Sequence, residues 1–569
     1  MARKKRPIWT LDCETDPFLT KEDAEKRGIP YPRDPKPFLW GIYEGKKEQY
    51  HEFREVAEVL AFLTGEYASG EKPIVYAHNG GKFADYHALR FAINTDEPIM
   101  VISGRLGKFR IGECEFRDSL NIIPVGLASF QKDEIDYSIM EADVRWEAGN
   151  YAKISAYMRN DCVYLFNVIA EYHNRFGRGL TQAGASMRYW AKKYDKKPPK
   201  QSAANFERLK PFYYGGRVEC FKSGYKEVPF TVVDINSAYP RAMLEQHPFS
   251  AVPDLSSTLP KKADIPQSMI DLVGVSRGAL PYREDSGKLI FPNDDEPRRY
   301  TVTGWEYLAA LELGDLDVFD IEQVYTFPEL VSFKDYIEDF YNQRLVAKAN
   351  GDKTGDIFAK LFMNSLYGKF ASDPLKYKEW VIASDDTYFE WAAKGFVPER
   401  PWHENYLFKR GLPVERQRYY NIATAASITG YVRAFLYRSL RACKGVIYCD
   451  TDSIAAEDVS GLHQGKELGL WKREIDCKAY AVAGKKLYAF LDRNSYAPAD
   501  AEKKGLERGT GGYWKTACKG VDLSPDEIVA VAKGGTVEYA PRVPTYSILK
   551  DEPVFTSRAV RMTAEPIAA

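Results

Sequence analysis

The feature that most constrains this chain is a pair of carboxylates one residue apart, Asp450 and Asp452, directly after an apolar run. The residues Val-Ile-Tyr at 446–448 predict a strand that enters a tight turn, and strand alternation would send both carboxylates to one face. A second apolar run, at 231–233, ends in Asp234. Either acidic turn alone would be an ordinary surface feature. Two strands that each end in carboxylates favour a two-metal phosphoryl-transfer centre, with cations about 4 Å apart.

A separate segment carries groups that suit a nucleoside triphosphate. Lys360, Asn364 and Tyr367 are spaced i, i+4 and i+7, so they project from one face of a predicted helix. The lysine can neutralise phosphate, the ring can pack on a base or sugar, and Gly368 lets a ligand approach the backbone. Taken alone, the segment could equally be an amphipathic helix with an incidental lysine. Together with the two carboxylate strands, it favours nucleotidyl transfer.

The amino-terminal third repeats the carboxylate pattern. Asp12 and Glu14 follow a short apolar run, and a buried strand at 74–77 enters a Gly-rich turn that is followed by Asp85. Asp161 lies in a helical stretch, one turn after Tyr157. Each carboxylate alone would be a helix cap or a surface acid. The set predicts a metal-assisted hydrolase that directs hydroxide at a terminal phosphodiester.

Length and composition limit the class of protein. A chain of 569 residues is too long for one hydrophobic core, and 45% hydrophobic with 28% charged residues is an ordinary globular composition. The net charge of −1 argues against a nonspecific basic DNA-coating protein, so any contacts with DNA must be local. The 14% share of aromatic residues suits base stacking, although we expect most of them in the core.

Cysteine and hydropathy patterns predict a soluble protein. The eight cysteines show no C-x-x-C spacing, which disfavours a zinc site or a disulfide framework. There is no signal peptide and no apolar run of about 18 residues. We therefore expect a protein of a reducing compartment, the cytoplasm of a host cell if the chain is viral, with no membrane association and as a monomer.

The order of three motifs resembles a known family. The motifs are Asp-x-Asn-Ser-x-Tyr-Pro at 234–240, Lys-x-x-x-Asn-Ser-x-Tyr-Gly-Lys at 360–369 and Tyr-Cys-Asp-Thr-Asp-Ser at 448–453. They resemble the family B DNA polymerases, specifically the protein-primed branch of phages. Further matches lie at 213–216, 429–433, 468–471 and 486–488. The runs at 344–352 and 483–488 are most similar to the tectivirus-type phage enzymes, and the resemblance covers nearly the whole chain.

The resemblance implies an α/β and α+β multidomain fold, in which an RNase H-like 3′–5′ exonuclease domain precedes a right-hand polymerase domain. We expect the exonuclease over 1–185 and the polymerase over 186–569. Within the latter, the palm would cover about 205–335 and 422–520, the fingers about 336–371 and the thumb about 521–569. An insertion at about 373–421 would enclose DNA, unless it is a plain surface hairpin, and another would precede the fingers at about 285–333.

For polymerisation, the resemblance implies that Asp234 and Asp452 hold two Mg²⁺ ions, with Mn²⁺ as a possible substitute, and that Asp450 supports them. Tyr239 would lie beneath the sugar and exclude a 2′-hydroxyl. Lys486 would contact a phosphate or, equally, the primer strand. The residues expected to contact the incoming nucleotide are Tyr239, Lys360, Asn364, Tyr367 and Lys486.

For the exonuclease, the resemblance implies metal ligands at Asp12, Glu14 and Asp161. In the family the remaining catalytic aspartate directly follows the Phe of Asn-x-x-x-Phe, but here Ala84 takes that place and Asp85 comes next. Either a bulge of one residue lets Asp85 reach the site, which we favour, or editing is impaired. The full catalytic set is Asp12, Glu14, Asp85, Tyr157 and Asp161. The implied DNA-binding residues are His78, Asn79, Phe83, Ser119, Leu120, Tyr213, Gly215, Gly216, Thr429, Arg433 and Tyr488.

The function expected from these patterns is DNA-dependent DNA synthesis with proofreading. Protein priming implies template and primer DNA, dNTPs and a separate terminal protein whose hydroxyl accepts the first nucleotide, with strand displacement along a linear phage-type genome. One alternative is a conventional or primer-independent family B polymerase. Another is a noncatalytic DNA-binding replication protein, which the intact Asp234, Asp450 and Asp452 argue against.

Overall fold

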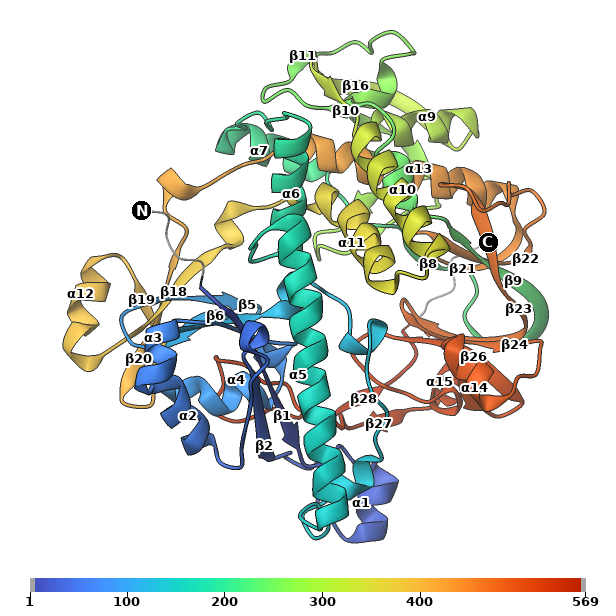
Figure 1. Ribbon diagram of the computed structural model, residues 1–569. Helices are drawn as coiled ribbons and strands as arrows, with labels where there is room; N and C mark the ends of the chain where they lie inside the picture. Colours follow the sequence, from blue (N-terminus) through green and yellow to red (C-terminus); the bar gives the residue numbers. More distant parts are fainter. Residues whose placement is uncertain (1–5, 564–569) are drawn as a thin grey trace.

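The protein is organised around two large β-sheets (Figure 1). The computed structural model describes residues 6–563. In the first sheet the strand order is β19-β20-β18-β5-β6-β7-β4-β1-β2-β3. Its amino-terminal strands are β1 (Ile8–Thr15), β2 (Pro37–Tyr43), β3 (Tyr50–Phe53), β4 (Ile74–Ala77), β5 (Pro98–Ile102), β6 (Arg105–Ile111) and β7 (Cys114–Asp118).

A helix of 29 residues, α5 (Ala148–Phe176), covers this sheet and continues beyond it. It packs on β1 and β2, and it forms the long central column of Figure 1, with α6 (Gln182–Lys193) above it. The last turns of α5 enter the core of the other half, where the Phe176 ring stacks on Phe362 at a centroid distance of 3.8 Å. One continuous core therefore crosses the predicted boundary near residue 185.

The second sheet has the order β25-β26-β24-β23-β9-β22-β21-β8. Its central strand β9 pairs antiparallel with β22 and β23, and the buried helix α13 (Ile422–Ala442) packs nearby. The apolar run before Asp234 is buried because β9 is flanked by strands on both sides. The strands are β8 (Val218–Cys220), β9 (Gly224–Ile235), β21 (Lys444–Asp450), β22 (Ser453–Asp458), β23 (Trp471–Gly484), β24 (Leu487–Asp492), β25 (Glu507–Gly509) and β26 (Gly512–Cys518).

The stretch predicted as fingers contains two helices, α10 (Lys334–Ala349) and α11 (Lys353–Phe370). Asp352 caps α11 by accepting a hydrogen bond from the backbone N–H of Gly355 at 2.8 Å. The apolar faces of both helices pack against each other and α6, in the core that also receives the end of α5.

The insertion at 373–421 extends the first sheet instead of standing apart. It supplies β18 (Lys378–Ala383), β19 (Val397–Trp402) and β20 (Asn405–Gly411), and β18 pairs antiparallel with β5. Two of these strands, β18 and β20, contain the apolar runs at 380–382 and 406–408. Helix α12 (Tyr388–Ala393) lies between β18 and β19, at the left edge of Figure 1.

A smaller sheet precedes the fingers, with the order β11-β16-β12-β15. Its elements are β11 (Asp254–Ser256), β12 (Met269–Ser276), β15 (Arg298–Thr303), α9 (Gly304–Glu312) and β16 (Leu316–Thr326). We call residues 254–326 the upper subdomain, because they lie at the top of Figure 1. The insertion expected at about 285–333 covers only part of this sheet, since β11 and β12 come before it in the chain.

Shorter elements complete the described chain. They are α1 (Lys21–Arg27), α2 (Val56–Thr64), α3 (Glu66–Glu71), α4 (Ala84–Leu89), α7 (Ala203–Leu209), α8 (Ala238–Ala242), β10 (His247–Pro248), β13 (Tyr282–Arg283), β14 (Leu289–Ile290), β17 (Leu330–Val331), α14 (Pro498–Lys503), α15 (Pro525–Ala532), β27 (Val537–Tyr539) and β28 (Arg558–Val560).

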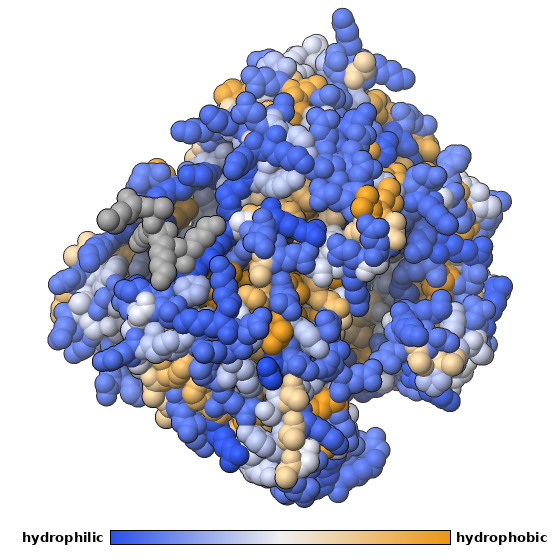
Figure 2. Space-filling model, viewed as in Figure 1, coloured by the Kyte–Doolittle hydropathy of each residue, from blue (hydrophilic) through white to orange (hydrophobic). Residues whose placement is uncertain are grey.

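The face of the molecule shown in Figure 2 is mostly hydrophilic, with apolar residues in small patches. In the described range, no helix has the length and apolar character needed to span a bilayer. All eight cysteines are free in the structure.

Candidate active sites

A cavity of about 820 Å³ lies between the second sheet and the finger helices. Asp234 stands near the end of β9 and Asp452 immediately before β22, and the register of the two strands pairs Asp234 with Ser453. Both carboxylates line the cavity. Burial, together with the nearby Asp452, raises the pKa of Asp234 to about 7. Because ionising two neighbouring buried carboxylates is unfavourable without a counter-charge, this pair is suited to bind cations.

The side chains of Asp450 and Asp452 have different surroundings. The backbone of Thr451 takes a left-handed conformation with φ 56°, which ends strand alternation before Asp452. Asp452 lines the cavity, whereas both oxygens of Asp450 accept bonds from Lys486 Nζ, at 2.7 and 2.5 Å. Thr451 therefore interrupts the expected alternation, although Asp450 still lies close enough to Asp452 to raise the pKa of that carboxyl. The ammonium of Lys486 is bound by Asp450 and does not line this cavity.

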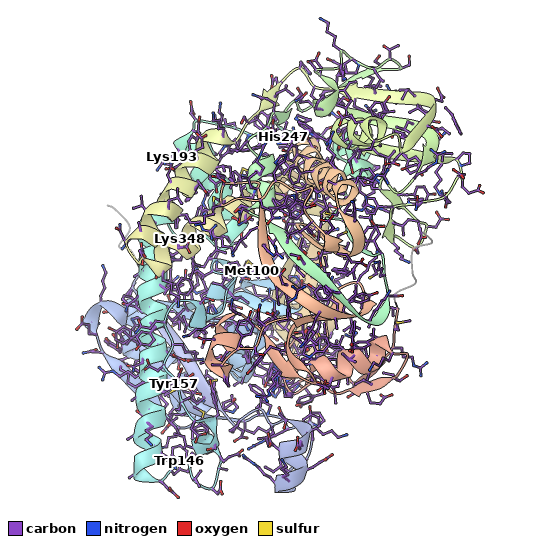
Figure 3. All side chains as sticks on the ribbon, turned by 90° about the vertical axis from the view of Figure 1, so that its right-hand side faces the viewer. Met100, Trp146, Tyr157, Lys193, His247 and Lys348 are labelled. Carbon is purple, nitrogen blue, oxygen red and sulfur yellow. The ribbon has the colours of Figure 1, made fainter. Side chains whose placement is uncertain are left out.

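The fingers face the carboxylates with positive charge. Lys360 and Asn364 line the cavity as predicted from their spacing, and both are exposed. Sequence reasoning missed Arg344 and Lys348 of α10, which line the same cavity; their i, i+4 spacing was the available signal. Figure 3 shows Lys348 near the end of its helix. On the palm side, the residues missed are Lys466, Lys472 and Glu474.

Tyr239 and Tyr367 form one aromatic unit at the floor of this cavity. Their rings stack at 4.3 Å with an interplanar angle of 11°. Tyr239 lines the cavity, and Tyr367 packs behind it. The ring of Tyr367 therefore restrains Tyr239, the residue expected to exclude a 2′-hydroxyl. A flexible side chain at position 367 would not provide this restraint.

Several residues assigned to DNA contacts are buried. Thr429 and Arg433 are each 2% exposed, so direct contact with DNA does not fit them. Thr429 Oγ1 donates to the carbonyl of Ala426, and Arg433 is bound within the protein. Tyr488, 9% exposed, stacks on Phe490 under the second sheet. Of the other residues in this group, Tyr213 and Gly216 are half-buried and Gly215 is exposed.

A second cavity, of about 590 Å³, lies where β1, α4 and α5 meet. It brings together all the carboxylates predicted for the exonuclease, although they come from three elements. Ser119 does not line it: the side chain is fully buried and lies 3.0 Å from His78 Nδ1. The predicted residues that line the cavity are Asp12, Glu14, His78, Asn79, Phe83, Leu120, Asp85, Tyr157 and Asp161.

The carboxylates of this second cavity suppress one another's ionisation. Burial raises the pKa of Asp12 well above its ordinary value, and Asp85, Glu14 and Asp161 raise it further. Burial likewise raises the pKa of Glu14 to about 8. One cation was missed by sequence reasoning: Lys132 Nζ lies 3.5 Å from Asp161 Oδ2. A lone lysine in a loop carries no signal that could have identified it.

Asp85 reaches the site despite the extra residue before it. It lies in the first turn of α4 and is 6% exposed, and Asn79 takes a left-handed conformation with φ 61° where the chain leaves β4. Burial raises the pKa of Asp85 to about 7, against hydrogen bonds that include one from Cys13. Asp85 lines the cavity together with Asp12 and lies close enough to it to raise the pKa of the Asp12 carboxyl.

Comparison with known proteins places the chain in a family. The family model for DNA polymerase type B, organellar and viral, matches residues 139–397. The DNA-directed DNA polymerase of Enterobacteria phage PRD1 is 32% identical over 585 aligned positions, which cover 99% of each chain. The chain belongs to the type B DNA polymerases of organelles and viruses. It is therefore a DNA polymerase, as the three motifs predicted.

Other type B polymerases match less closely. The DNA polymerase of Bacillus phage Nf is 26% identical over 319 residues, 52% of each chain. The structure of phi29 DNA polymerase superposes with a TM-score of 0.72 at 18% identity, over 98% of this chain and 100% of that one. A phi29 complex with primer-template DNA and incoming nucleotide substrates gives a TM-score of 0.70. The likeness confirms the predicted fold class, an exonuclease domain followed by palm, fingers and thumb.

Both cavities suit cations that a substrate helps to bind. Within residues 6–563, no three His, Cys, Asp or Glu side chains converge into a complete metal site. Mg²⁺ usually takes one or two carboxylates together with substrate phosphates, so an incomplete protein site is compatible with it. In the second cavity, buried polar atoms lack protein partners: His78 Nε2, Asn79 Oδ1 and Asp161 Oδ1. Such atoms are satisfied when a polar ligand is bound.

Proposed function

We propose that this type B polymerase is a protein-primed, strand-displacing DNA polymerase with a 3′–5′ proofreading exonuclease. The observation that carries the polymerase site is the cavity in which Asp234 and Asp452 face Arg344, Lys348 and Lys360. Carboxylates on one wall suit metal ions, and cations on the other suit a triphosphate. Substrates would be template and primer DNA and the four dNTPs.

The residues of the chain would divide the work of nucleotidyl transfer. Asp234 and Asp452 would hold two Mg²⁺ ions, or Mn²⁺, which when bound stabilise charge on the attacking and leaving oxygens. Lys360, Arg344 and Lys348 would neutralise the triphosphate. Tyr239 would contact the sugar. Lys486 would hold Asp450 in position beside the site, since its Nζ lies 2.5 Å from the Asp450 carboxylate.

For proofreading, we propose that Asp12, Glu14, Asp85 and Asp161 bind metal ions while His78, Asn79, Phe83 and Leu120 hold a single strand. Tyr157 lies beside Asp161 and would orient the attacking water. Figure 3 shows Tyr157 on α5 well below Lys348, so the two cavities are separate and a primer end must travel between them. Tyr213, Gly215 and Gly216 remain candidates for contacts on the polymerase side.

The proposed domain boundaries follow the expectations given above: exonuclease 1–185, palm 205–335 and 422–520, fingers 336–371, insertion 373–421 and thumb 521–569. The structure adds one modification to this proposal. The insertion strands β18 to β20 are part of the sheet of the exonuclease domain, so the insertion would move with that domain.

Protein priming is the finer part of the proposal. It is supported by the upper subdomain and the insertion, two additions to the palm and fingers, and by 32% identity to a phage polymerase along the whole chain. The partner would be a terminal protein that offers a Ser, Thr or Tyr hydroxyl. The test is transfer of labelled dAMP to a candidate terminal protein, alongside extension of an ordinary primed template by the same preparation.

The two assays separate the alternatives. Labelling of the candidate protein by wild type but not by Asp452→Asn supports protein priming. Extension of a primed template without any labelling, for every candidate encoded beside this chain, favours a conventional type B polymerase. Loss of neither activity in Asp452→Asn would remove the assignment of the site.

A further inference from the structure

A buried ion pair joins the upper subdomain to helix α13. Arg433 Nε lies 2.7 Å from Glu306 Oε1, and the two residues are 2% and 3% exposed. Glu306 Oε2 accepts from the backbone N–H and hydroxyl of Thr303, which fixes the carboxylate at the start of α9. Desolvation of a buried pair offsets most of its attraction, so stability alone does not account for it.

Arg433, which is paired with Glu306, also binds the loop that precedes β8. Its Nη1 donates to the carbonyl oxygens of Tyr214 and Gly215, at 2.7 and 2.9 Å. The ring of Tyr214 is 3% exposed, and its hydroxyl lies 2.8 Å from Thr301 Oγ1 of β15. The upper subdomain therefore holds this loop through a side chain and through two backbone carbonyls.

The same loop holds the catalytic turn. The carbonyl of Arg217 accepts from the backbone N–H of Thr451 at 2.7 Å. Gly216 packs so closely on Thr451 that a β-carbon there would overlap its hydroxyl. Thr451 has φ 56°, a conformation that costs a β-branched residue energy and persists only where its surroundings enforce it. This residue separates Asp450 from Asp452.

We propose that Glu306 and Arg433 are positioning residues for nucleotidyl transfer. They hold the loop 214–217, the loop holds Thr451, and Thr451 sets the placement of Asp452 toward Asp234. The match at 429–433 then has a structural reason besides DNA contact: Gly430 leaves room for Thr303, where a β-carbon would overlap, and Arg433 reaches the loop. The inference rests on the proposed polymerase site, in which Asp452 is a metal ligand.

The test compares two ion pairs between the same helices. Arg433→Lys keeps the charge but loses the fork that reaches two carbonyls. Arg438→Lys is the matched control, because Arg438 pairs with Glu312 across α13 and α9 at the surface, 2.6 Å apart and away from the loop. The measurements are single-nucleotide incorporation at saturating primer-template, the KM for dNTP, the Kd for primer-template and degradation of a single strand.

Arg433→Lys is expected to lower kcat by about 10-fold to 100-fold, because small displacements of reacting groups have effects of that size. The Kd for primer-template and single-strand degradation should stay within about 2-fold of wild type, and Arg438→Lys should match wild type throughout. Asp452→Asn in the same assay must be inactive. If it is active, the proposed site fails, and that result is distinct from a failure of the positioning role.

Two results would overturn the positioning role. One is an unchanged kcat in folded Arg433→Lys. The other is a weaker Kd with an unchanged kcat at saturation, which marks a direct DNA contact. If circular dichroism shows that Arg433→Lys does not fold, the positioning role is tested with Glu306→Gln and Thr301→Val. These variants weaken the contacts that the upper subdomain makes with Arg433 and with Tyr214. An unchanged kcat in both would overturn the role.

Discussion

At the scale of single residues, both cavities place carboxylates where burial and like charge oppose ionisation. Burial raises the pKa of Asp234 to about 7 and that of Asp85 to about 7, and in each case a neighbouring carboxylate contributes. Such groups destabilise the protein when they are ionised without a bound cation, and they give cations a strong reason to bind. The energetic cost of ionising these buried carboxylates without a cation thus favours cation binding in both cavities.

Asp234→Asn is expected to stabilise the metal-free protein at pH 8. The folded pKa of Asp234 lies above its unfolded value, so the native state binds more protons and wild-type stability falls as pH rises from about 4 to about 7. The amide lacks this penalty, which we put at about 1–2 kcal/mol because the group is partly exposed. Melting in chelator should show a higher Tm for the variant at pH 8 and a shrinking difference toward pH 4. A lower Tm at pH 8 would contradict the assignment.

Tyr239→Val is expected to admit ribonucleotides with a modest loss of DNA synthesis. The stacked Tyr367 holds the Tyr239 ring rigidly, and valine cannot fill the same space. The dNTP to rNTP preference in single-nucleotide incorporation should fall by about 10-fold or more, equivalent to about 1.4 kcal/mol of discrimination. Tyr367→Phe, which keeps the stack, serves as the control. An unchanged preference in Tyr239→Val would mean that another residue excludes the 2′-hydroxyl.

Sequence reasoning located the carboxylates because strand-then-acid patterns repeat in a fixed order. It missed Lys132 because a lone cation in a loop carries no pattern. It missed Arg344 and Lys348 because their i, i+4 spacing shows a shared helix face but not what that face meets. The burial of Arg433 could not be predicted for a different reason: it depends on Glu306, 127 positions away, and no local pattern reveals that pairing. Sequence motifs therefore identify candidate residues, but they do not show whether the side chains of those residues are exposed.

At the scale of elements, α4 decides the outcome for proofreading. Both Ala84 and Asp85, in its first turn, line the cavity, but Asp85 brings the carboxylate and raises the pKa of Asp12. Asp85→Ala is therefore expected to reduce degradation of a labelled single strand about as severely as Asp12→Ala. Ala84→Asp should not raise the rate above wild type. Full activity of Asp85→Ala beside an inactive Asp12→Ala would show that α4 does not carry a ligand.

The insertion is tied to the exonuclease domain by Asp96, in the segment before β5. Its carboxylate accepts from Ser384 Oγ at 2.9 Å, from Trp391 Nε1 at 2.8 Å and from the hydroxyl of Thr387. Asp96→Ala leaves these donors without their acceptor, a loss of about 1–3 kcal/mol at this junction. Single-nucleotide addition should persist while product length on a strand-displacement template falls. Asp386→Ala, an exposed neighbour, is the control, and equal product lengths for the two variants would contradict this role.

The helices of the fingers could be predicted because their apolar periodicity is local. Strand β19 could not, since Pro398 and Pro401 disfavour a strand; it is tolerated because it lies at the edge of the sheet. The pairing of β18 with β5 joins residues about 280 positions apart, Trp380 with Ile99, and no sequence pattern specifies such a register.

At the scale of the whole molecule, the two activities share one framework. Helix α5 carries Tyr157 and Asp161 in its first half and packs on the fingers with its last turns. The carboxy-terminal segment returns to the exonuclease domain, where Ile548 is 3% exposed and its backbone N–H donates to Gly104 at 2.8 Å. The start of the polymerase half and the segment around Ile548 are thus both anchored in the exonuclease half, which suits a primer end that passes between two fixed cavities.

The most direct test of the polymerase site is single-turnover incorporation of one dNTP by wild type, Asp234→Asn and Asp452→Asn, with primer-template binding measured in parallel. Each variant should lose about 1,000-fold or more in rate, about 4 kcal/mol of transition-state stabilisation, while its Kd for primer-template stays within about 2-fold of wild type. Incorporation by either variant within about 10-fold of the wild-type rate would contradict the assignment of these two carboxylates.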